Sequence, residues 1–239
     1  MTLSKCFEPP HTRLGGIIYL AIIVLGLFGE AVVRGSLVVS GDAAGTASHI
    51  LASQGLWRAG IAGDLLMHVL DVPLIVILYL LLKPVSRTLA LLATLFNIVQ
   101  TSTLVANKLT LLVAVEALSS STLRSGLSPK ELDALSYLAI NIHGYGFAVG
   151  LVFFGFACIV RGYLLFVSGY VPRPLGLLLG LAGISYLVNS TALIVAPSLA
   201  SVLFPVILLP ALVGELALCL WLLLKGVDAK AWQQQVANT

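Results

Sequence analysis

Charged residues are scarce in this chain: Asp, Glu, Lys and Arg make up 10% of its 239 residues. Soluble domains carry about 25% charged residues, and no polar stretch here is long enough to form a separate soluble domain. The chain also lacks a basic patch with interleaved aromatic residues, which argues against nucleic acid as a partner. Its three cysteines show no disulfide framework and no paired spacing of the kind that binds zinc. These absences exclude soluble enzymes, nucleic-acid-binding modules and disulfide-rich secreted domains.

Apolar residues are abundant, at 59% of the chain. Several apolar runs exceed the roughly 20 residues that an α-helix needs to cross a bilayer. The sequence therefore predicts an all-α polytopic membrane protein whose surroundings are the lipid bilayer. We expect one integral membrane domain over residues 1–239, with six transmembrane helices at about residues 14–39, 57–82, 88–118, 131–161, 175–195 and 199–224.

Basic residues are distributed unequally between the two sets of predicted helix ends. One set has Lys5, Arg13, Lys83, Arg87, Arg161, Arg173, Lys225 and Lys230. The other set has Arg34, Arg58, Arg124 and Lys130. Because cytoplasmic loops carry the excess of Lys and Arg, this bias predicts that both termini are cytoplasmic.

Several short patterns predict local structure. Asp42 begins either a short amphipathic helix that Gly55 closes or an irregular loop. Residues 119–127 read as a polar loop, and Ser128-Pro129-Lys130-Glu131 is typical of a helix start. Pro73 is expected to kink the second helix. Gly146-x3-Gly150 and Gly176-x3-Gly180 would let the fourth and fifth helices approach closely.

The most unusual feature is a stripe of ionisable residues, Asp64, His68 and Asp71, in a strongly apolar segment. On a helix these positions share one narrow face. Charged groups at membrane depth are costly, and they usually face a bundle interior or a wet cavity. Three on one face exceed what packing needs, so a functional role is the better interpretation of this stripe.

The predicted topology places polar residues from all six helices at similar depths. His68 and His143 each lie roughly 16–18 Å below the outer helix ends, at 1.5 Å per residue. Near the midplane lie Asp71, Glu215, Gln100 and Asn189, and in the outer half lie Glu30, Asp64 and Lys108. This pattern favours a polar cavity that opens outward.

Three functions are compatible with this zone. The first is binding or transport of a small molecule or ion, with Asp64, His68, Asp71, His143, Glu215, Gln100 and Asn189 as candidate ligands. The second is a metal-dependent intramembrane hydrolase in which His68, His143 and Asp71 hold zinc or another divalent metal. The third is structural, with Glu30, Arg34, Asp64 and Lys108 as packing ion pairs. Two histidines at one depth would also fit a haem, but no paired histidine ladder supports one.

For several of these residues an ordinary structural role is the better interpretation than a role in ligand binding or catalysis. Glu30 and Arg34 are four residues apart and are expected to pair with each other or with Lys108. A lone His143 is more often a hydrogen-bonded core residue than a ligand. Gln100 and Asn189 are expected to bridge helices by hydrogen bonds.

Ordered segments along nearly the whole chain resemble a family of bacterial multi-pass membrane proteins, the domain of unknown function 4386 family. The segments are residues 29–36, 41–43, 64–65 with Asp71, 82–85, 143–147, 153–155 and 168–173. The resemblance implies a multi-helix protein of the bacterial inner membrane and no established activity. It supports the architecture and leaves the three functions open.

Overall fold

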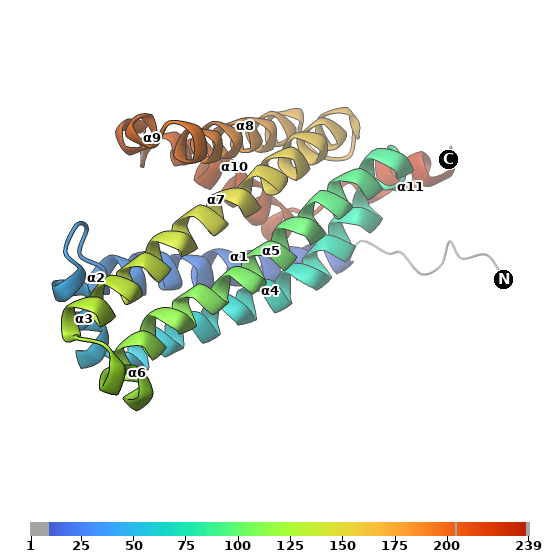
Figure 1. Cartoon of the computed structure of the whole chain (residues 1–239). Coiled ribbons are helices and arrows are strands. Elements are labelled where there is room, and N and C mark those ends of the chain that lie inside the picture. Colours follow the sequence, from blue (N-terminus) through green and yellow to red (C-terminus); the bar gives the residue numbers. More distant parts are fainter. Residues whose placement is uncertain (1–9, 204, 238–239) are drawn as a thin grey trace. The chain divides into compact units, whose positions relative to one another are not determined.

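A computed structural model describes residues 10–203 and 205–237 of the chain. Within these ranges the chain is helical and contains no strand (Figure 1). Six helices are long and apolar enough to cross a membrane, which confirms the predicted fold class. They span Thr12–Leu37, Gln54–Leu82, Arg87–Ser119, Pro129–Val167, Arg173–Val195 and Val206–Leu224. Lys5 and Cys6 lie outside the described residues.

The helices and their bounds are as follows. The first three spans contain α1 (Pro10–Leu27), the π-helix η2 (Phe28–Arg34), α2 (Gly35–Leu37), α4 (Gln54–Leu82) and α5 (Arg87–Ser119). The last three contain α7 (Pro129–Val167), α8 (Arg173–Val195), the 3-10 turn η3 (Val206–Leu208) and α10 (Leu209–Leu224). The shorter helices are α3 (Ala43–Ala52), α6 (Ser121–Gly126), α9 (Pro197–Leu203) and α11 (Ala229–Ala237).

Three predicted boundaries differ from the structure. The segment expected to be a polar loop contains α6, because the Ser120 hydroxyl accepts a hydrogen bond from Leu123 N (3.5 Å) and caps a short helix. The fourth helix continues to Val167 rather than ending at residue 161. The sixth is divided into α9, η3 and α10, and the division falls at Pro205, which has no N–H to continue a helical ladder.

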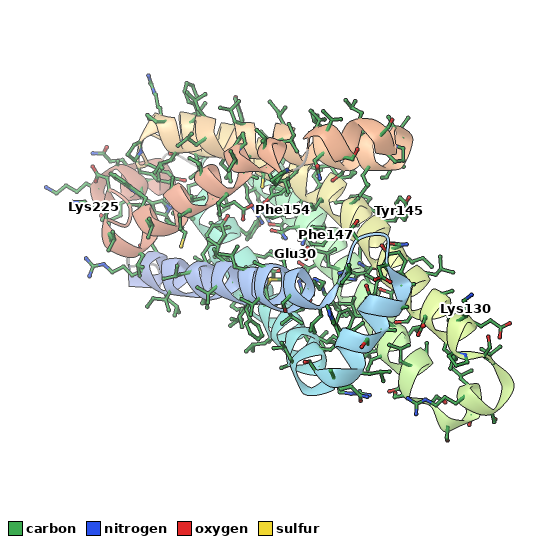
Figure 2. The ribbon with its side chains drawn as sticks, turned by 90° about the vertical axis from the view of Figure 1, so that its left-hand side faces the viewer. Glu30, Lys130, Tyr145, Phe147, Phe154 and Lys225 are labelled. Atoms are coloured by element: carbon green, nitrogen blue, oxygen red, sulfur yellow. The ribbon has the colours of Figure 1, made fainter. Side chains whose placement is uncertain are left out.

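Helix starts follow the local chemistry of the sequence. The Asp42 carboxylate accepts from Gly45 N at 2.9 Å, so the short helix α3 forms and ends before Ser53. At the start of α7, the Glu131 carboxylate accepts hydrogen bonds from the backbone N–H and the hydroxyl of Ser128, both at 2.7 Å. Glu131 thus caps the Ser128 N–H as the serine and glutamate spacing predicts. The Ser128 hydroxyl donates to Glu131, and the Glu131 N–H donates to the Ser128 backbone carbonyl at 3.0 Å. Lys130, in the same turn, is exposed to solvent (Figure 2).

The described chain divides into two compact units, each of which we treat by itself. Unit 1 comprises residues 1–21, 70–101 and 148–239, and unit 2 comprises residues 22–69 and 102–147. Of the predicted stripe, Asp64 and His68 belong to unit 2 and Asp71 belongs to unit 1.

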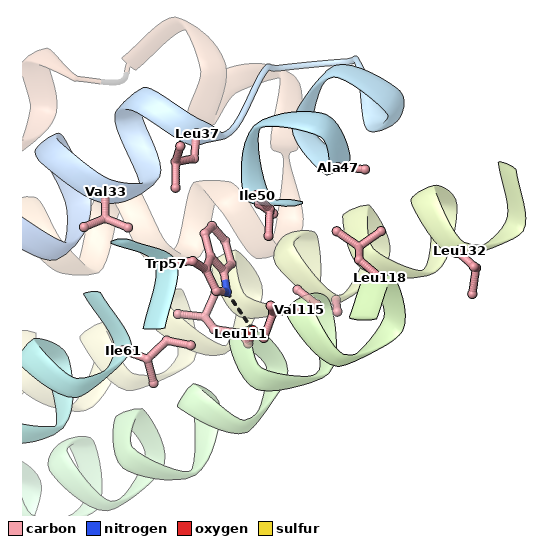
Figure 3. Packing of buried hydrophobic residues seen from close by; sticks show 12 residues of the cluster. Val33, Leu37, Ala47, Ile50, Trp57, Ile61, Leu111, Val115, Leu118 and Leu132 are labelled. Atoms are coloured by element: carbon pink, nitrogen blue, oxygen red, sulfur yellow. Dashed lines mark hydrogen bonds between the residues drawn. The ribbon is translucent and has the colours of Figure 1, made fainter. Parts of the chain in front are cut away.

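Unit 2 has a hydrophobic cluster centred on Trp57 (Figure 3). Trp57 is buried at the start of α4, and its indole Nε1 donates to the Leu111 carbonyl at 3.0 Å. Side chains from η2, α2, α3, α4, α5 and α7 complete the cluster: Val33, Leu37, Ala47, Ile50, Ile61, Ala114, Val115, Leu118, Leu132 and Ala139. The cluster holds the short helix α3 against the ends of longer helices within this unit.

In unit 1, glycines bring α7 and α8 close together. A Cβ atom at Gly162 would lie 2.6 Å from the Gly176 carbonyl oxygen and 2.7 Å from Gly180 N. Gly155 of α7 and Gly183 of α8 form a similar close contact farther along the same two helices. Gly176 takes part in the contact that its motif predicts. Gly146 instead faces Asn107 of α5 in unit 2, so it does not serve α7–α8 packing.

The turn between α7 and α8 is anchored within unit 1. The Tyr170 hydroxyl donates to the Leu81 carbonyl at 2.7 Å, and Trp232 Nε1 of α11 donates to the same oxygen at 3.1 Å. Burial raises the pKa of Tyr170, so its hydroxyl stays protonated and keeps this hydrogen bond at physiological pH. The same carbonyl therefore fixes both the turn and the C-terminal helix.

Candidate functional site

Asp64 is the centre of a buried group of charges in unit 2. Its side chain is on α4 and the residue is 0% exposed. The carboxylate oxygen Oδ2 accepts from Arg34 Nη1 at 2.8 Å and from Lys108 Nζ at 2.9 Å. Arg34 also binds Glu30 through Nε at 2.8 Å. We call Glu30, Arg34, Asp64 and Lys108 the ion cluster; they come from η2, α4 and α5.

The two carboxylate oxygens of Asp64 have different surroundings. Oδ2 accepts hydrogen bonds from Arg34 and Lys108. Oδ1 is buried and has no hydrogen-bond partner among the described residues. The Gly29 backbone packs directly against Oδ1, and a Cβ atom at this position would collide with it. A buried carboxylate oxygen normally has a partner. Oδ1 is therefore a buried acceptor of the ion cluster that no described residue satisfies.

The π-helix η2 positions the two η2 members of the ion cluster. Gly35 N donates to the Glu30 carbonyl, five residues earlier, which is the π-helical bond. Arg34 is the last residue of η2, and its side chain is largely buried, whereas the Glu30 side chain is 69% exposed (Figure 2). Isolated π turns inside α-helices are frequent at functional sites.

A buried histidine and asparagine adjoin the ion cluster in unit 2. Asn107 Nδ2 donates to the His143 carbonyl at 2.8 Å and lies 3.1 Å from His143 Nδ1. His143 Nδ1 also lies 3.4 Å from the Asn107 carbonyl oxygen, so the ring tautomer decides whether Nδ1 accepts from the amide or donates to this carbonyl. Arg34, Asp64 and Lys108 all act electrostatically on His143. His143 is thus a neighbour of the ion cluster whose Nδ1 is already engaged.

The predicted metal ligands are not assembled into a site. Among residues 10–203 and 205–237, no group of three His, Cys, Asp or Glu side chains is placed to hold a metal ion. His68 and His143 are both buried in unit 2, and Asp71 belongs to unit 1. The described geometry therefore gives no support to the hydrolase that this set would serve.

Other polar candidates form a second group, in unit 1. The Thr101 hydroxyl lies 3.2 Å from Asp71 Oδ2 and 3.1 Å from Gln100 Oε1, and Asn97 Nδ2 donates to the same Gln100 oxygen at 2.7 Å. On α10, the Glu215 carboxylate accepts from the Tyr19 hydroxyl at 3.1 Å and from the Tyr186 hydroxyl. Asn189 follows three residues after Tyr186 on α8 and is half-buried.

A pocket of about 530 Å³ lies in unit 1, away from all of these candidates. Its walls are residues 169–172, Trp221 and residues 225–228. None of the predicted site residues lines it. We therefore base the functional argument on the buried polar groups.

The chain matches the family model described as "Domain of unknown function (DUF4386)" over residues 14–226. The chain belongs to this family. A relative in Archaeoglobus fulgidus, described as an uncharacterized protein, is 30% identical over 166 residues, which is 70% of this chain and 83% of the relative. No solved structure matches the chain.

Three of the segments by which the chain resembles the DUF4386 family lie close together in unit 2, whereas the segments at residues 82–85, 153–155 and 168–173 belong to unit 1. Residues 29–36 supply Glu30 and Arg34, residues 64–65 supply Asp64, and residues 143–147 supply His143. The structure brings the first three side chains into direct contact, and His143 lies within their electrostatic reach. These three segments therefore lie together in unit 2.

Sequence reasoning did not identify Tyr19, Tyr186 or Arg161 as site residues. Tyrosines in apolar helices are commonly core or interfacial residues, and no spacing links Tyr19 to Tyr186. Arg161 was assigned to a membrane surface, but in the structure it is only 5% exposed. The one available signal was Glu215, which is the sole charged residue of its helix and requires a partner.

Unit 2 also contains an exposed ion pair that serves as a control. Arg58 Nη2 and Glu116 Oε1 are 2.8 Å apart, with side chains 47% and 56% exposed. Surface pairs of this kind contribute about 0–1 kcal/mol. Arg58→Gln is thus expected to change the free energy of unfolding by no more than about 1 kcal/mol, as measured by denaturant unfolding in detergent. A larger loss would show that this pair is not solvated.

Proposed function

We propose that this member of the DUF4386 family binds a small solute or ion within the membrane, and that the ion cluster is its binding site. The observation that carries the proposal is the state of Asp64: it is fully buried, two cations bind one oxygen, and the other oxygen has no partner. An ionisable group in a membrane-spanning helix is by default a candidate functional group.

Packing alone is a poor reason to keep these charges. Replacing a buried ion pair or triad with apolar residues of similar volume is often neutral or stabilising. The cost of desolvating three charged groups is therefore hard to recover through stability. A ligand that interacts with the same charges supplies the missing reason.

The charge of the buried part favours an anionic ligand. Arg34 and Lys108 carry two positive charges, and Glu30 and Asp64 carry two negative ones. The Glu30 side chain is 69% exposed, so its charge is screened, and the buried part keeps two cations against the one carboxylate of Asp64. The guanidinium of Arg34 presents several N–H donors in a planar fork that suits carboxylate and phosphate groups. A small oxyanion bound here would also balance the excess positive charge.

The membrane placement follows from the distribution of basic residues. The excess at one set of helix ends supports an orientation with both termini in the cytoplasm. The family resemblance supports the bacterial inner membrane. Movement of the bound anion across the membrane is the function that such a site would serve.

The test is anion-dependent thermal stability of the detergent-purified protein. Tm is measured with sodium phosphate, sulfate, acetate and succinate at constant ionic strength, with chloride as the reference. We expect at least one of these anions to raise Tm saturably, since a ligand that binds only the folded state stabilises it by mass action. Arg34→Gln should abolish the rise, and Arg58→Gln should keep it.

Two outcomes would contradict the proposal. If no anion in the panel raises Tm of the wild-type protein, the ion cluster is not an oxyanion site. If Arg34→Gln shows the same rise, the anions act elsewhere. In either case the remaining role of the ion cluster is structural, because it connects η2, α4 and α5 by ion pairs.

A further inference from the structure

We propose that Glu215 is a second functional site, one that binds and releases a proton, with Tyr19 and Tyr186 as its hydrogen-bond partners. All three residues belong to unit 1, and none belongs to the ion cluster. The inference therefore goes beyond the proposed anion site and does not depend on it.

The geometry around Glu215 is suited to reversible protonation of its carboxyl group. The Tyr19 hydroxyl is 3.1 Å from Oε2, and the Tyr186 hydroxyl binds Oε1, so three helices meet at this carboxyl group. A tyrosine hydroxyl can both donate and accept. When Glu215 is ionised, both hydroxyls donate to it; when it is protonated, its O–H donates to one tyrosine oxygen. Both charge states thus keep two hydrogen bonds.

Groups from five helices face Glu215 among the described residues. Those that interact with it electrostatically or by hydrogen bonds are Tyr19 of α1, Asp71 of α4, Cys158 and Arg161 of α7, Tyr186 of α8 and Cys219 of α10. Glu215 therefore shares its surroundings with a second carboxylate, Asp71, and with one guanidinium, Arg161. A charge on Glu215 is costly within a membrane-spanning bundle, and a single proton removes that charge.

Arg161 provides an independent indication that this region takes up a small polar species. The residue is 5% exposed, and its Nη2 atom has no hydrogen-bond partner in the described part of the chain. Buried polar groups almost always have a partner. Asp71, Tyr19 and Glu215 are its electrostatic neighbours. The guanidinium N–H is therefore where an acceptor such as water binds, next to the carboxyl group that exchanges its proton.

A proton explains this group better than a metal cation does. The described residues contain no group of three His, Cys, Asp or Glu side chains that could hold a metal ion. Tyrosine hydroxyls that donate to both oxygens of Glu215 also occupy the positions a cation would use. A proton needs only one of the two oxygens and no additional ligand.

Dicyclohexylcarbodiimide tests the proposal directly, because this apolar reagent enters membranes and reacts with protonated carboxyl groups. The full-length protein is reconstituted in phosphatidylcholine vesicles and treated with the reagent over a pH series. The modified residue is identified by peptide mass spectrometry. We expect modification at Glu215 that falls as pH rises, and no modification of that peptide in Glu215→Gln. Glu116, whose side chain is 56% exposed, is the internal control.

Tyr19→Phe and Tyr186→Phe distinguish a proton site from a static contact. Each substitution removes one donor to the ionised form, so modification of Glu215 should persist to higher pH than in the wild type. Infrared difference spectra between low and high pH give a second reading, in which a protonated carboxyl band is present in the wild type and lost in Glu215→Gln.

Two results of these measurements would contradict reversible proton binding at Glu215. If Glu215 is not modified at any pH and Glu215→Gln removes no carboxyl band, the residue is a permanently ionised structural acceptor. If modification is independent of pH, the proton is held permanently and is not released. Both results would overturn the proposal. Anion-dependent Tm plays no part in these measurements, so failure here leaves the proposed anion site to be judged separately.

Discussion

Asp64→Ala is expected to lower the free energy of unfolding by about 3–5 kcal/mol, because it leaves buried cations without their counter-charge. Lys108 Nζ would lose its 2.9 Å contact with Asp64, and Arg34 would keep only the exposed carboxylate of Glu30. The measurement is denaturant-induced unfolding of the purified protein in detergent, followed by tryptophan fluorescence. Where the single variant does not fold, Asp64→Asn gives the smaller change needed for comparison.

Two further variants show whether the loss arises from buried charge. Glu116→Ala removes one partner of an exposed ion pair and should cost no more than about 1 kcal/mol. The triple variant Arg34→Met, Asp64→Leu and Lys108→Met removes all buried charges together. It should recover most of the stability lost in Asp64→Ala, since an apolar replacement needs no counter-charge. Equal effects of Asp64→Ala and Glu116→Ala would contradict the buried position of the ion cluster.

Gly162→Val should disrupt the packing of α7 on α8 and cost at least about 1–3 kcal/mol, the usual range for overpacking. The added Cβ atom would lie 2.6 Å from the Gly176 carbonyl oxygen and 2.7 Å from Gly180 N. Both neighbours are backbone atoms, which no change of rotamer can move. Only separation of the two helices relieves the contact. The readout is the same unfolding measurement, supported by the elution volume on size-exclusion chromatography.

Gly180→Ala is the matched control for this contact. Gly180 belongs to α8 and to the motif Gly176-x3-Gly180, but a Cβ atom there would meet nothing within 4 Å. Alanine is the better helix former by about 1 kcal/mol, so this variant should be neutral or slightly stabilised. If both variants are equally destabilised, the glycines act through backbone flexibility and not through close approach.

The architecture was accessible from the sequence because membrane spans depend on a strong local signal. A run of about twenty apolar residues has few alternatives to a transmembrane helix, and all six spans appear in the structure. The Ser128–Glu131 start was readable for the same reason, whereas the pattern at Asp42 left a short helix and a loop equally open, and the helix ends at Ala52 rather than at Gly55. Helix ends were harder: α6 depends on a single serine cap, and α7 continues beyond the length a bilayer requires.

The site was only partly accessible, because its contacts join residues far apart in the sequence. Glu30 and Arg34 are four residues apart, and such a spacing predicts a pair. Lys108 binds Asp64 from 44 positions away, and the sequence offered this ion pair as one of three interpretations, because a common depth does not decide between a contact and a ligand site. The partners of Glu215 are tyrosines 196 and 29 positions away. Their hydroxyls give no periodic pattern that would separate them from ordinary core aromatics.

The π-helix η2 makes the number of residues in this segment as important as their identity. A bond from residue 35 to residue 30 accommodates one residue more than an α-helical turn holds. Because the wide turn absorbs this extra residue, deleting one residue from η2 would return the segment to an α-helix and rotate the residues beyond it far less than the roughly 100° that a deletion in a regular α-helix causes. Leu37 would keep its place in the Trp57 cluster, whereas the wide turn that carries Glu30 and Arg34 would be lost. A one-residue deletion in η2 would therefore separate the contribution of the π turn to the ion cluster from the hydrophobic packing that follows it.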